Sequence, residues 1–280
     1  MKSIVVILVL SLFALSEARY FKIGYDQQPL PSNPNKAYAS RIVNGEPADI
    51  AEFPHMLVLL DLTVGGFICG ASIISRTWTL SAAHCLEFNV PANLINFRAG
   101  STNRLSGGTV YIAASYHLHP QYNTRTLEFD VAVARTTEHM DGINITPVAL
   151  PPICNTICCT VCENVAVTTS GWGRNEAGIF PANLMQLTKP VHEFNDCVRI
   201  WATFRIVITE DSFCKSAFDN RDTCNGDSGS PLVIGEGANR VQVGVVSFGA
   251  PVCGDNSRPS GNARIEHPAI RSWITNISGI

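Results

Sequence analysis

Residues 221–231, which read RDTCNGDSGSP, place two aspartates close to one serine in a glycine-rich segment. Asp222 lies six residues before Ser228, and Asp227 directly precedes it. A carboxylate that is buried in such a turn loses its hydration, so each aspartate needs a partner that offsets this cost. The segment therefore poses two questions: which group each carboxylate binds, and whether Ser228 is a nucleophile or only a turn residue.

The composition of the chain is that of a globular protein. It has 280 residues, of which 46% are hydrophobic and 15% are charged. The formal net charge of −3 favours neither nucleic acid nor an anionic membrane as a partner. Residues 1–18 combine Lys2, an apolar run from Ile4 to Leu15 and the ending Ser-Glu-Ala, which is typical of a secretory signal peptide. We therefore expect a secreted, extracellular protein whose ten cysteines form disulfides.

The chain from residue 42 onward has the pattern of an all-β protein. Short β-branched and apolar runs recur, for example at 56–60, 131–134 and 241–248, and many of them end at Gly, Pro, Asn or Asp. Many short strands at nearly regular spacing predict a sandwich or a barrel. Only two stretches have a helical pattern, residues 194–200 and residues 268–277 at the end of the chain.

Three separated motifs within this β pattern contain residues that are able to act in catalysis. The segment LSAAHC contains His84, FDVAVAR contains Asp130, and GDSGSP contains Ser228. Each motif alone is weak, because a histidine, an aspartate before a strand or a serine in a glycine turn is usually structural. Together, in the order His, Asp, Ser, they make residues 42–280 resemble the trypsin/chymotrypsin-like serine endopeptidases.

This resemblance implies a fold and a mechanism. The fold would be two packed six-stranded antiparallel β-barrels with a C-terminal helix and the active site between the barrels. Ser228 would attack the scissile carbonyl, His84 would move the proton, and Asp130 would hold the imidazole. The backbone N–H groups of Gly226 and Ser228 would form the oxyanion hole, and Ser247 would hydrogen-bond the buried aspartate.

The resemblance also implies activation from a precursor. The segment RIVNG, which begins at Arg41, is similar to the activation site of the family. Cleavage there by a trypsin-like protease would remove a propeptide, residues 19–41, and release the catalytic domain, residues 42–280. The freed α-amino group of Ile42 would then pair with Asp227, which makes this aspartate a switch and not an acid or base.

The other aspartate, Asp222, occupies the position at which trypsins have the floor of the pocket for the side chain before the cut. The rest of that pocket would come from Ser247, Gly249 and Ser260, and Ser260 stands where trypsins keep a glycine. A buried carboxylate attracts Lys or Arg, so we expect cleavage after basic residues, with Lys relatively favoured. In the alternative, Ser260 hydrogen-bonds Asp222 and blocks the floor, which would give a chymotrypsin-like, elastase-like or collagenolytic preference.

The cysteines follow the resemblance only in part. A further disulfide of the family is replaced here by Val167 and Ile234, which we expect to make an apolar contact. Four clustered cysteines have no counterpart, and in an oxidising compartment two local disulfides are favoured over a zinc site. A bond between adjacent Cys158 and Cys159 would be strained, which leaves two pairings. The pairs implied by the resemblance are Cys69–Cys85, Cys197–Cys214 and Cys224–Cys253, and the clustered cysteines are Cys154, Cys158, Cys159 and Cys162.

No cofactor and no metal are expected. The family's calcium loop corresponds to residues 100–110, where no Asp or Glu occurs. The expected partners are protein or peptide substrates, an activating trypsin-like protease and protein protease inhibitors, and the protein is expected to be a monomer. The style of the sequence resembles arthropod digestive enzymes, which favours the gut lumen. The alternative from another class is a non-catalytic homologue that acts as a binding protein. Asn144 and Asn276 begin N-x-S/T triplets and are candidates for glycosylation.

Overall fold

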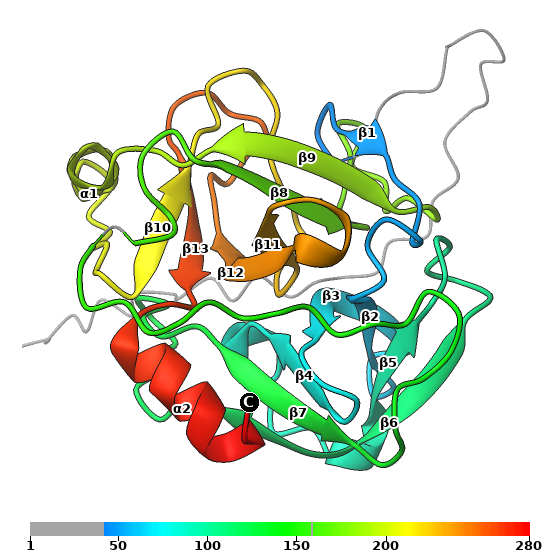
Figure 1. Cartoon of the computed structure of the whole chain (residues 1–280). Coiled ribbons are helices and arrows are strands. Elements are labelled where there is room, and N and C mark those ends of the chain that lie inside the picture. Colours follow the sequence, from blue (N-terminus) through cyan, green and yellow to red (C-terminus); the bar gives the residue numbers. More distant parts are fainter. Residues whose placement is uncertain (1–41, 158) are drawn as a thin grey trace, which may run out of the picture. The chain divides into compact units, whose positions relative to one another are not determined.

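The computed structural model describes residues 42–157 and 159–280 (Figure 1). The predicted signal peptide, the predicted propeptide with Arg41, and Cys158 lie outside the described residues. All described residues belong to one compact unit. None of the helices in this part of the chain is long and apolar enough to span a bilayer.

The first half of the described chain forms a closed antiparallel barrel. Its strands are joined in the order β2-β3-β4-β7-β6-β5. Strand β5 shows the period of two that such a wall requires, because Ile95, Phe97 and Ala99 are buried while Asn96 and Arg98 between them are not. The strands are β2 (Met56–Asp61), β3 (Gly66–Ile73), β4 (Trp78–Ser81), β5 (Ile95–Ala99), β6 (Thr109–Leu118) and β7 (Ala132–Thr136).

The second half forms a curled antiparallel sheet. Its seven strands follow the order β1-β9-β8-β11-β12-β13-β10. An isolated bridge joins Val191, just after β9, to Lys215 on β10, so the far edge of the sheet curls back toward its beginning. The strands are β1 (Glu46–Pro47), β8 (Ala166–Gly171), β9 (Met185–Pro190), β10 (Ser212–Lys215), β11 (Pro231–Ile234), β12 (Val241–Phe248) and β13 (Ser260–Arg264).

The predicted two-barrel fold is therefore confirmed, with one difference. Only the first barrel is closed by continuous strand ladders, whereas the second is a curled sheet that an isolated bridge completes. Val167 and Ile234 lie in the same apolar cluster of this sheet, as the missing disulfide led us to expect.

Both predicted helices are present. Helix α1 (Phe194–Ala202) begins where the Glu193 side chain accepts hydrogen bonds from the backbone N–H groups of Asn195 and Asp196. Helix α2 (Pro268–Ser278) has proline in its first turn and ends at Gly279, whose φ of +79° suits a residue without Cβ. Single 3₁₀ turns complete the list, at η1 (Ala83–Cys85), η2 (Ala92–Leu94) and η3 (Gly237–Asn239).

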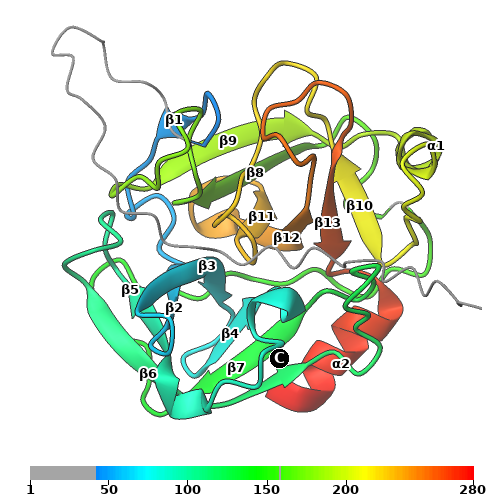
Figure 2. The same cartoon turned by 180° about the vertical axis from the view of Figure 1, so that it is seen from behind.

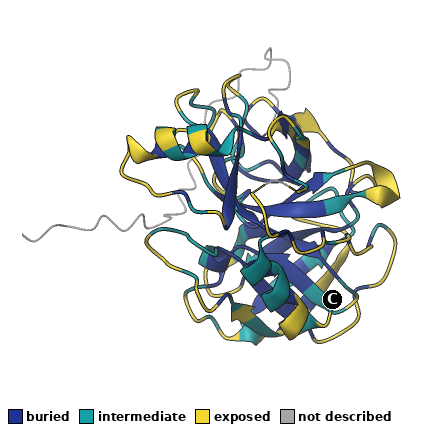
Figure 3. Cartoon of the chain, turned by 60° about the vertical axis from the view of Figure 1, so that its left-hand side comes forward, coloured by how far each residue is buried: buried dark blue, intermediate teal, exposed yellow. Residues whose placement is uncertain are grey.

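Helix α2 returns from the second sheet to the first barrel. It lies beside β7 in Figure 1, and the same packing is seen from behind in Figure 2. Ile270 and Ile274 are fully buried in the same apolar cluster as the first barrel's core. Figure 3 shows that buried residues gather in the strands of both halves, while exposed residues lie mainly in the loops and at the ends of elements.

The two halves meet along β3. The backbone N–H of Gly70 donates to the carbonyl of Ser228 at 2.8 Å. Two residues further along β3, the hydroxyl of Ser72 donates to the side chain of Gln242 on β12 at 2.6 Å, and both residues are fully buried. Polar groups that are buried in this way must be paired across the seam, so these bonds set how the two halves align.

Between described residues, the structure contains the three disulfides implied by the resemblance and a pair within the cysteine cluster, Cys154–Cys159. The clustered segment is held against β13 and the turn after it. The N–H of Cys154 donates to the carbonyl of Glu266 at 2.8 Å, and the N–H of Thr160 donates to its carboxylate at 3.0 Å. The linker between the two halves is therefore anchored by hydrogen bonds as well as by sulfur.

We expect Ile274→Ala to lower the free energy of unfolding by about 2–5 kcal/mol, because it leaves a cavity between α2 and the first barrel. Ile277→Ala is the matched control on the exposed side of the same helix and should cost about 1 kcal/mol or less. Urea denaturation followed by tryptophan fluorescence measures both, since Trp273 lies on the helix. Equal effects at the two positions would contradict this packing.

Candidate active site

His84 and Asp130 form a buried pair at the edge of the first barrel. His84 lies in the η1 turn, directly after β4, and its Nδ1 lies 2.7 Å from Asp130 Oδ2. The backbone N–H of His84 donates to the other carboxylate oxygen at 2.9 Å. Ser247 on β12 donates its hydroxyl to Asp130 Oδ2. Asp130 is fully buried, so its charge depends on these donors from both halves of the molecule.

Pairing shifts the pKa values of His84 and Asp130 in opposite directions. Burial by itself would lower the pKa of His84, but the charge of Asp130 and its hydrogen bond outweigh burial and raise that pKa above its ordinary value. Burial would raise the pKa of Asp130, but the His84 charge and the hydrogen bonds from His84 and Ser247 hold it below its usual range. His84 therefore carries a proton on Nδ1 toward the carboxylate, and its Nε2 is the free base.

Ser228 is held at the seam beside this pair. Its carbonyl accepts from Gly70 on β3, and the next N–H, that of Gly229, donates to Val246 on β12 at 2.8 Å. A Cβ on Gly229 would clash with the hydroxyl of Ser81, three residues before His84. The residue after Ser228 therefore packs against the segment that leads into His84. In the described part of the chain Ser228 Oγ makes no hydrogen bond to His84 Nε2, a bond that in free enzymes often tightens only around substrate.

The turn before Ser228 presents two backbone donors. Gly226 has a φ of +94°, and a Cβ there would lie 2.7 Å from the Phe180 ring and 3.0 Å from the Phe67 ring. Only glycine fits this conformation and this space. Neither the N–H of Gly226 nor that of Ser228 donates to a protein acceptor among the described residues. Both donors are therefore available to a negatively charged oxygen.

Asp227 is fully buried behind the same turn. It accepts the backbone N–H of Gly173 at 2.8 Å and that of Cys224 at 2.9 Å. Burial raises its pKa to about 6, and the two N–H groups and the Lys215 charge only partly oppose that rise. A Cβ on Gly173 would clash with the carboxylate, so the glycine makes room for it.

Ile42 lies in the same region of the second sheet. It is fully buried and packs against Met185 and Leu187 on β9. Met185 pairs with Gly171 on β8, and a Cβ on that glycine would clash with the carboxylate of Asp227. The first described residue is therefore near the buried aspartate.

Asp222 has a partner that sequence reasoning missed. Lys215, the last residue of β10, forms an ion pair with Asp222 Oδ1, and both side chains are almost fully buried. Ser260, the first residue of β13, donates its hydroxyl to the other carboxylate oxygen. Gly249 borders this group, because a Cβ there would lie 3.9 Å from Ser260 Cβ and 4.0 Å from Asp222 Oδ2.

A signal for Lys215 exists in the sequence. It directly follows Cys214 in the short run SFCK, a strand in which every residue is buried. A lysine in a fully buried strand needs an anionic partner. Which aspartate provides it depends on the strand register, which the sequence does not display.

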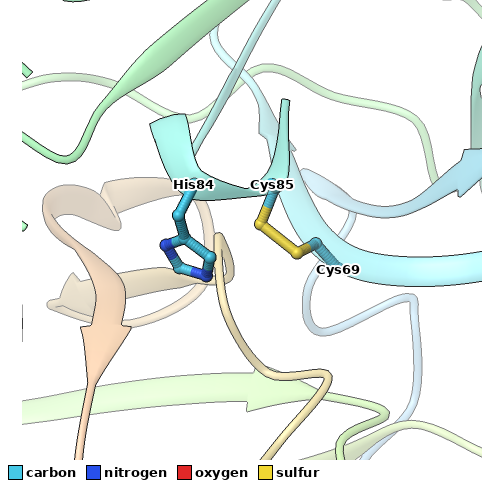
Figure 4. Close-up of side chains that lie close together, drawn as sticks. All are labelled: Cys69, His84 and Cys85. Atoms are coloured by element: carbon cyan, nitrogen blue, oxygen red, sulfur yellow. A yellow bond between two sulfur atoms is a disulfide. The ribbon is translucent and has the colours of Figure 1, made fainter. Parts of the chain in front are cut away.

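One group of the described residues has the composition of a metal site, Cys69, His84 and Cys85. Figure 4 shows His84 beside the two cysteines, whose sulfurs are joined to each other. Both thiolates are thus consumed by the disulfide, and the ring is committed to Asp130. This cluster does not have the chemistry of a metal site.

Comparisons with known proteins show which family this chain belongs to. The family model described as Trypsin matches residues 42–274. Trypsin, alkaline B, of Manduca sexta is 33% identical over 256 residues, which cover 89% of this chain and 93% of that protein. Trypsin alpha of Drosophila erecta is 32% identical over 237 residues, with 84% and 86% covered.

A longer relative is similar over the same region. Mannan-binding lectin serine protease 1 of Homo sapiens is 29% identical over 279 residues, which cover 90% of this chain and 37% of that protein. The chain therefore spans little more than a third of this relative but most of the length of the insect proteins.

Asp130→Asn should reverse the pKa shift of His84. With the carboxylate charge removed, burial dominates, so the pKa should fall from above 6.5 to below it. An NMR titration of the histidine side chains measures this. Asp141→Asn, which removes a carboxylate on the surface, should leave the His84 titration unchanged. If the His84 pKa does not fall in Asp130→Asn, the pair does not control this histidine.

Proposed function

The chain belongs to the trypsin family of serine endopeptidases, and on that premise we propose that it is a secreted protease released from an inactive precursor. The observation that carries the proposal is the buried Asp130, which holds the His84 ring beside Ser228 and the two free N–H groups. Its substrates are proteins and peptides, and the reaction is hydrolysis of a peptide bond through an acyl-enzyme.

Each group of the site has a role in this reaction. His84 Nε2 takes the proton of Ser228 as its oxygen attacks the carbonyl, and Asp130 stabilises the imidazolium that forms. The oxyanion of the tetrahedral intermediate binds the N–H groups of Gly226 and Ser228. His84 then gives the proton to the leaving amine. Water, deprotonated by His84, attacks the ester carbonyl of the acyl-enzyme, and the carboxylic acid is released as Ser228 regains its proton. These steps use side chains and backbone only, with no metal or cofactor.

Activation from a precursor would supply Asp227 with a cation, since no ion pair joins it to any described residue. Its folded pKa of about 6 lies above the ordinary 3.8, so its unfavourable contribution to stability appears as the pH rises from about 4 through 6. At neutral pH an ammonium group beside it would remove this penalty. Cleavage after Arg41 creates that ammonium on Ile42, whose side chain already packs in the same region.

The proposed maturation follows the predicted segments. Residues 1–18 direct secretion, residues 19–41 are removed by a trypsin-like protease, and residues 42–280 act as a monomer. The insect relatives are named trypsins, which supports proteins and peptides as the substrates. A digestive role and regulation by protein protease inhibitors are further parts of the proposal. For the residue before the cut, Asp222 alone would favour Lys or Arg, and that preference requires its carboxylate to be free for a substrate cation.

Ser228→Ala should abolish reaction with a fluorophosphonate probe and lower peptidase activity by a factor on the order of 10⁴ to 10⁶. Ser230→Ala is the matched control, since Ser230 lies two residues on and is fully buried; it should still be labelled. Mass spectrometry locates the label. An activated protein that takes no label at Ser228 would be the non-catalytic binding homologue.

Arg41→Gln should leave the precursor inactive after treatment with trypsin, because no Ile42 ammonium forms. Arg125→Gln removes an exposed arginine elsewhere and should activate normally. In the correctly cleaved protein, Asp227→Asn should lower activity at least about a hundredfold, because the new ammonium then lacks its buried partner. Full activity in the uncut Arg41→Gln protein would contradict the switch.

A further inference from the structure

Lys215 and Ser260 lie side by side because of strand register. They are directly opposed Cα partners in the antiparallel β10–β13 ladder, so their side chains project from the same face. Asp222 reaches the same point from the loop after β10, where a bridge to Val43 holds it. The three side chains therefore meet below Gly249, at the position where the site would receive the side chain before the cut.

The cluster satisfies its own hydrogen bonds. The Lys215 ammonium has three donors and three acceptors: Asp222 Oδ1, Thr223 Oγ1 at 2.9 Å and Ser260 Oγ at 3.1 Å. Asp222 Oδ1 also accepts the backbone N–H of Thr223 at 2.7 Å, and Oδ2 accepts the Ser260 hydroxyl. The ammonium of Lys215 and the hydroxyl of Ser260 thus donate only to acceptors within this cluster, so the network is closed and no donor is left for a substrate.

A closed network of this kind cannot recognise a substrate cation. Lys215 already neutralises the carboxylate, and a second ammonium or guanidinium would approach it as a like charge within a few ångströms. Lys215 cannot move aside into water, because it is fully buried and its acceptors are all at this point. The other buried carboxylate nearby, Asp227, already accepts two backbone N–H groups.

From this geometry we infer that Lys215 is a specificity-determining residue, which acts through Asp222 to make the enzyme cleave after uncharged, apolar side chains. The inference rests on the proposed protease function. An acidic substrate side chain is also disfavoured, because the charge of Lys215 is already compensated by Asp222 and the carboxylate of Asp222 would repel a second carboxylate. Polar side chains find no unpaired partner at the floor and lose their hydration. Apolar side chains have no such cost, and Gly249 has no side chain of its own that would cover the cluster.

The test uses the activated full-length protein and matched peptide amides with Leu, Phe, Lys, Arg or Glu before the cut. We expect kcat/KM for Leu or Phe to exceed that for Lys and Arg at least tenfold, and benzamidine to be a poor inhibitor. Lys or Arg equal to or better than the best apolar substrate would overturn the inference. Fluorophosphonate labelling of Ser228 in the same preparation separates this result from failure of the protease function itself.

Substitution at the pair identifies the cause. Lys215→Met keeps the length of the side chain and frees the Asp222 charge, so the Arg-to-Leu ratio of kcat/KM should rise at least tenfold and benzamidine should bind at least tenfold more tightly. Lys215→Met/Asp222→Asn has neither charge and should keep the apolar preference. A gain of cleavage after Arg in this double variant would show that the charge of Asp222 is not the determinant.

A control variant and a second readout separate the charge of Lys215 from a general loss of stability. Lys189→Met removes another buried lysine, whose aspartate partner Asp219 is partly exposed, and it should not change the substrate order. If Lys215→Met fails to fold, the double variant and the substrate order of the unaltered enzyme still decide, because both depend on a neutral pocket floor.

Discussion

The buried carboxylate of Asp130 is the interaction on which the rest of the site depends. It lies two residues before β7 of the first barrel, and it accepts hydrogen bonds from His84 in the same half of the molecule and from Ser247 in the second sheet. A buried carboxylate without these donors would be costly, so the two halves must meet in the register that supplies them. The same register brings Ser228 beside His84, since the Ser228 carbonyl accepts from β3 and the following N–H donates to β12.

Close packing at this seam leaves little freedom. Cβ atoms on Gly70 and on Gly229 would clash with atoms of the opposite half, so both glycines permit an approach that any side chain would prevent. Gly226 adds a backbone conformation with positive φ in the turn whose two N–H groups, those of Gly226 and Ser228, have no acceptor among the described residues. The scaffold therefore holds the donors, the base and the serine rigidly, which is what stabilisation of a short-lived oxyanion requires.

The second sheet solves the problem of buried carboxylates in two ways. Asp222 receives a permanent internal cation, Lys215, together with the Ser260 hydroxyl. Within residues 42–157 and 159–280, the donors to Asp227 are backbone N–H groups, and its pKa is raised to about 6, so it remains receptive to a further cation. The charges of the two aspartates before Ser228 are therefore compensated differently, although the residues lie five positions apart. This difference is what the proposed pocket and the proposed switch would each require.

Local patterns in the sequence were enough for the all-β class, for both helices and, through the order of three motifs, for the family. Hydrophobic period, capping residues and short motifs are properties of neighbouring residues, so one chain displays them. Three features required the tertiary structure: the open curl of the second sheet, the Cys154–Cys159 pairing and the ion pair of Lys215. The last matters most. Lys215 and Ser260 are 45 residues apart, and only the β10–β13 ladder makes them neighbours. The partner of a buried charge is decided by distance in space, and no local pattern encodes it.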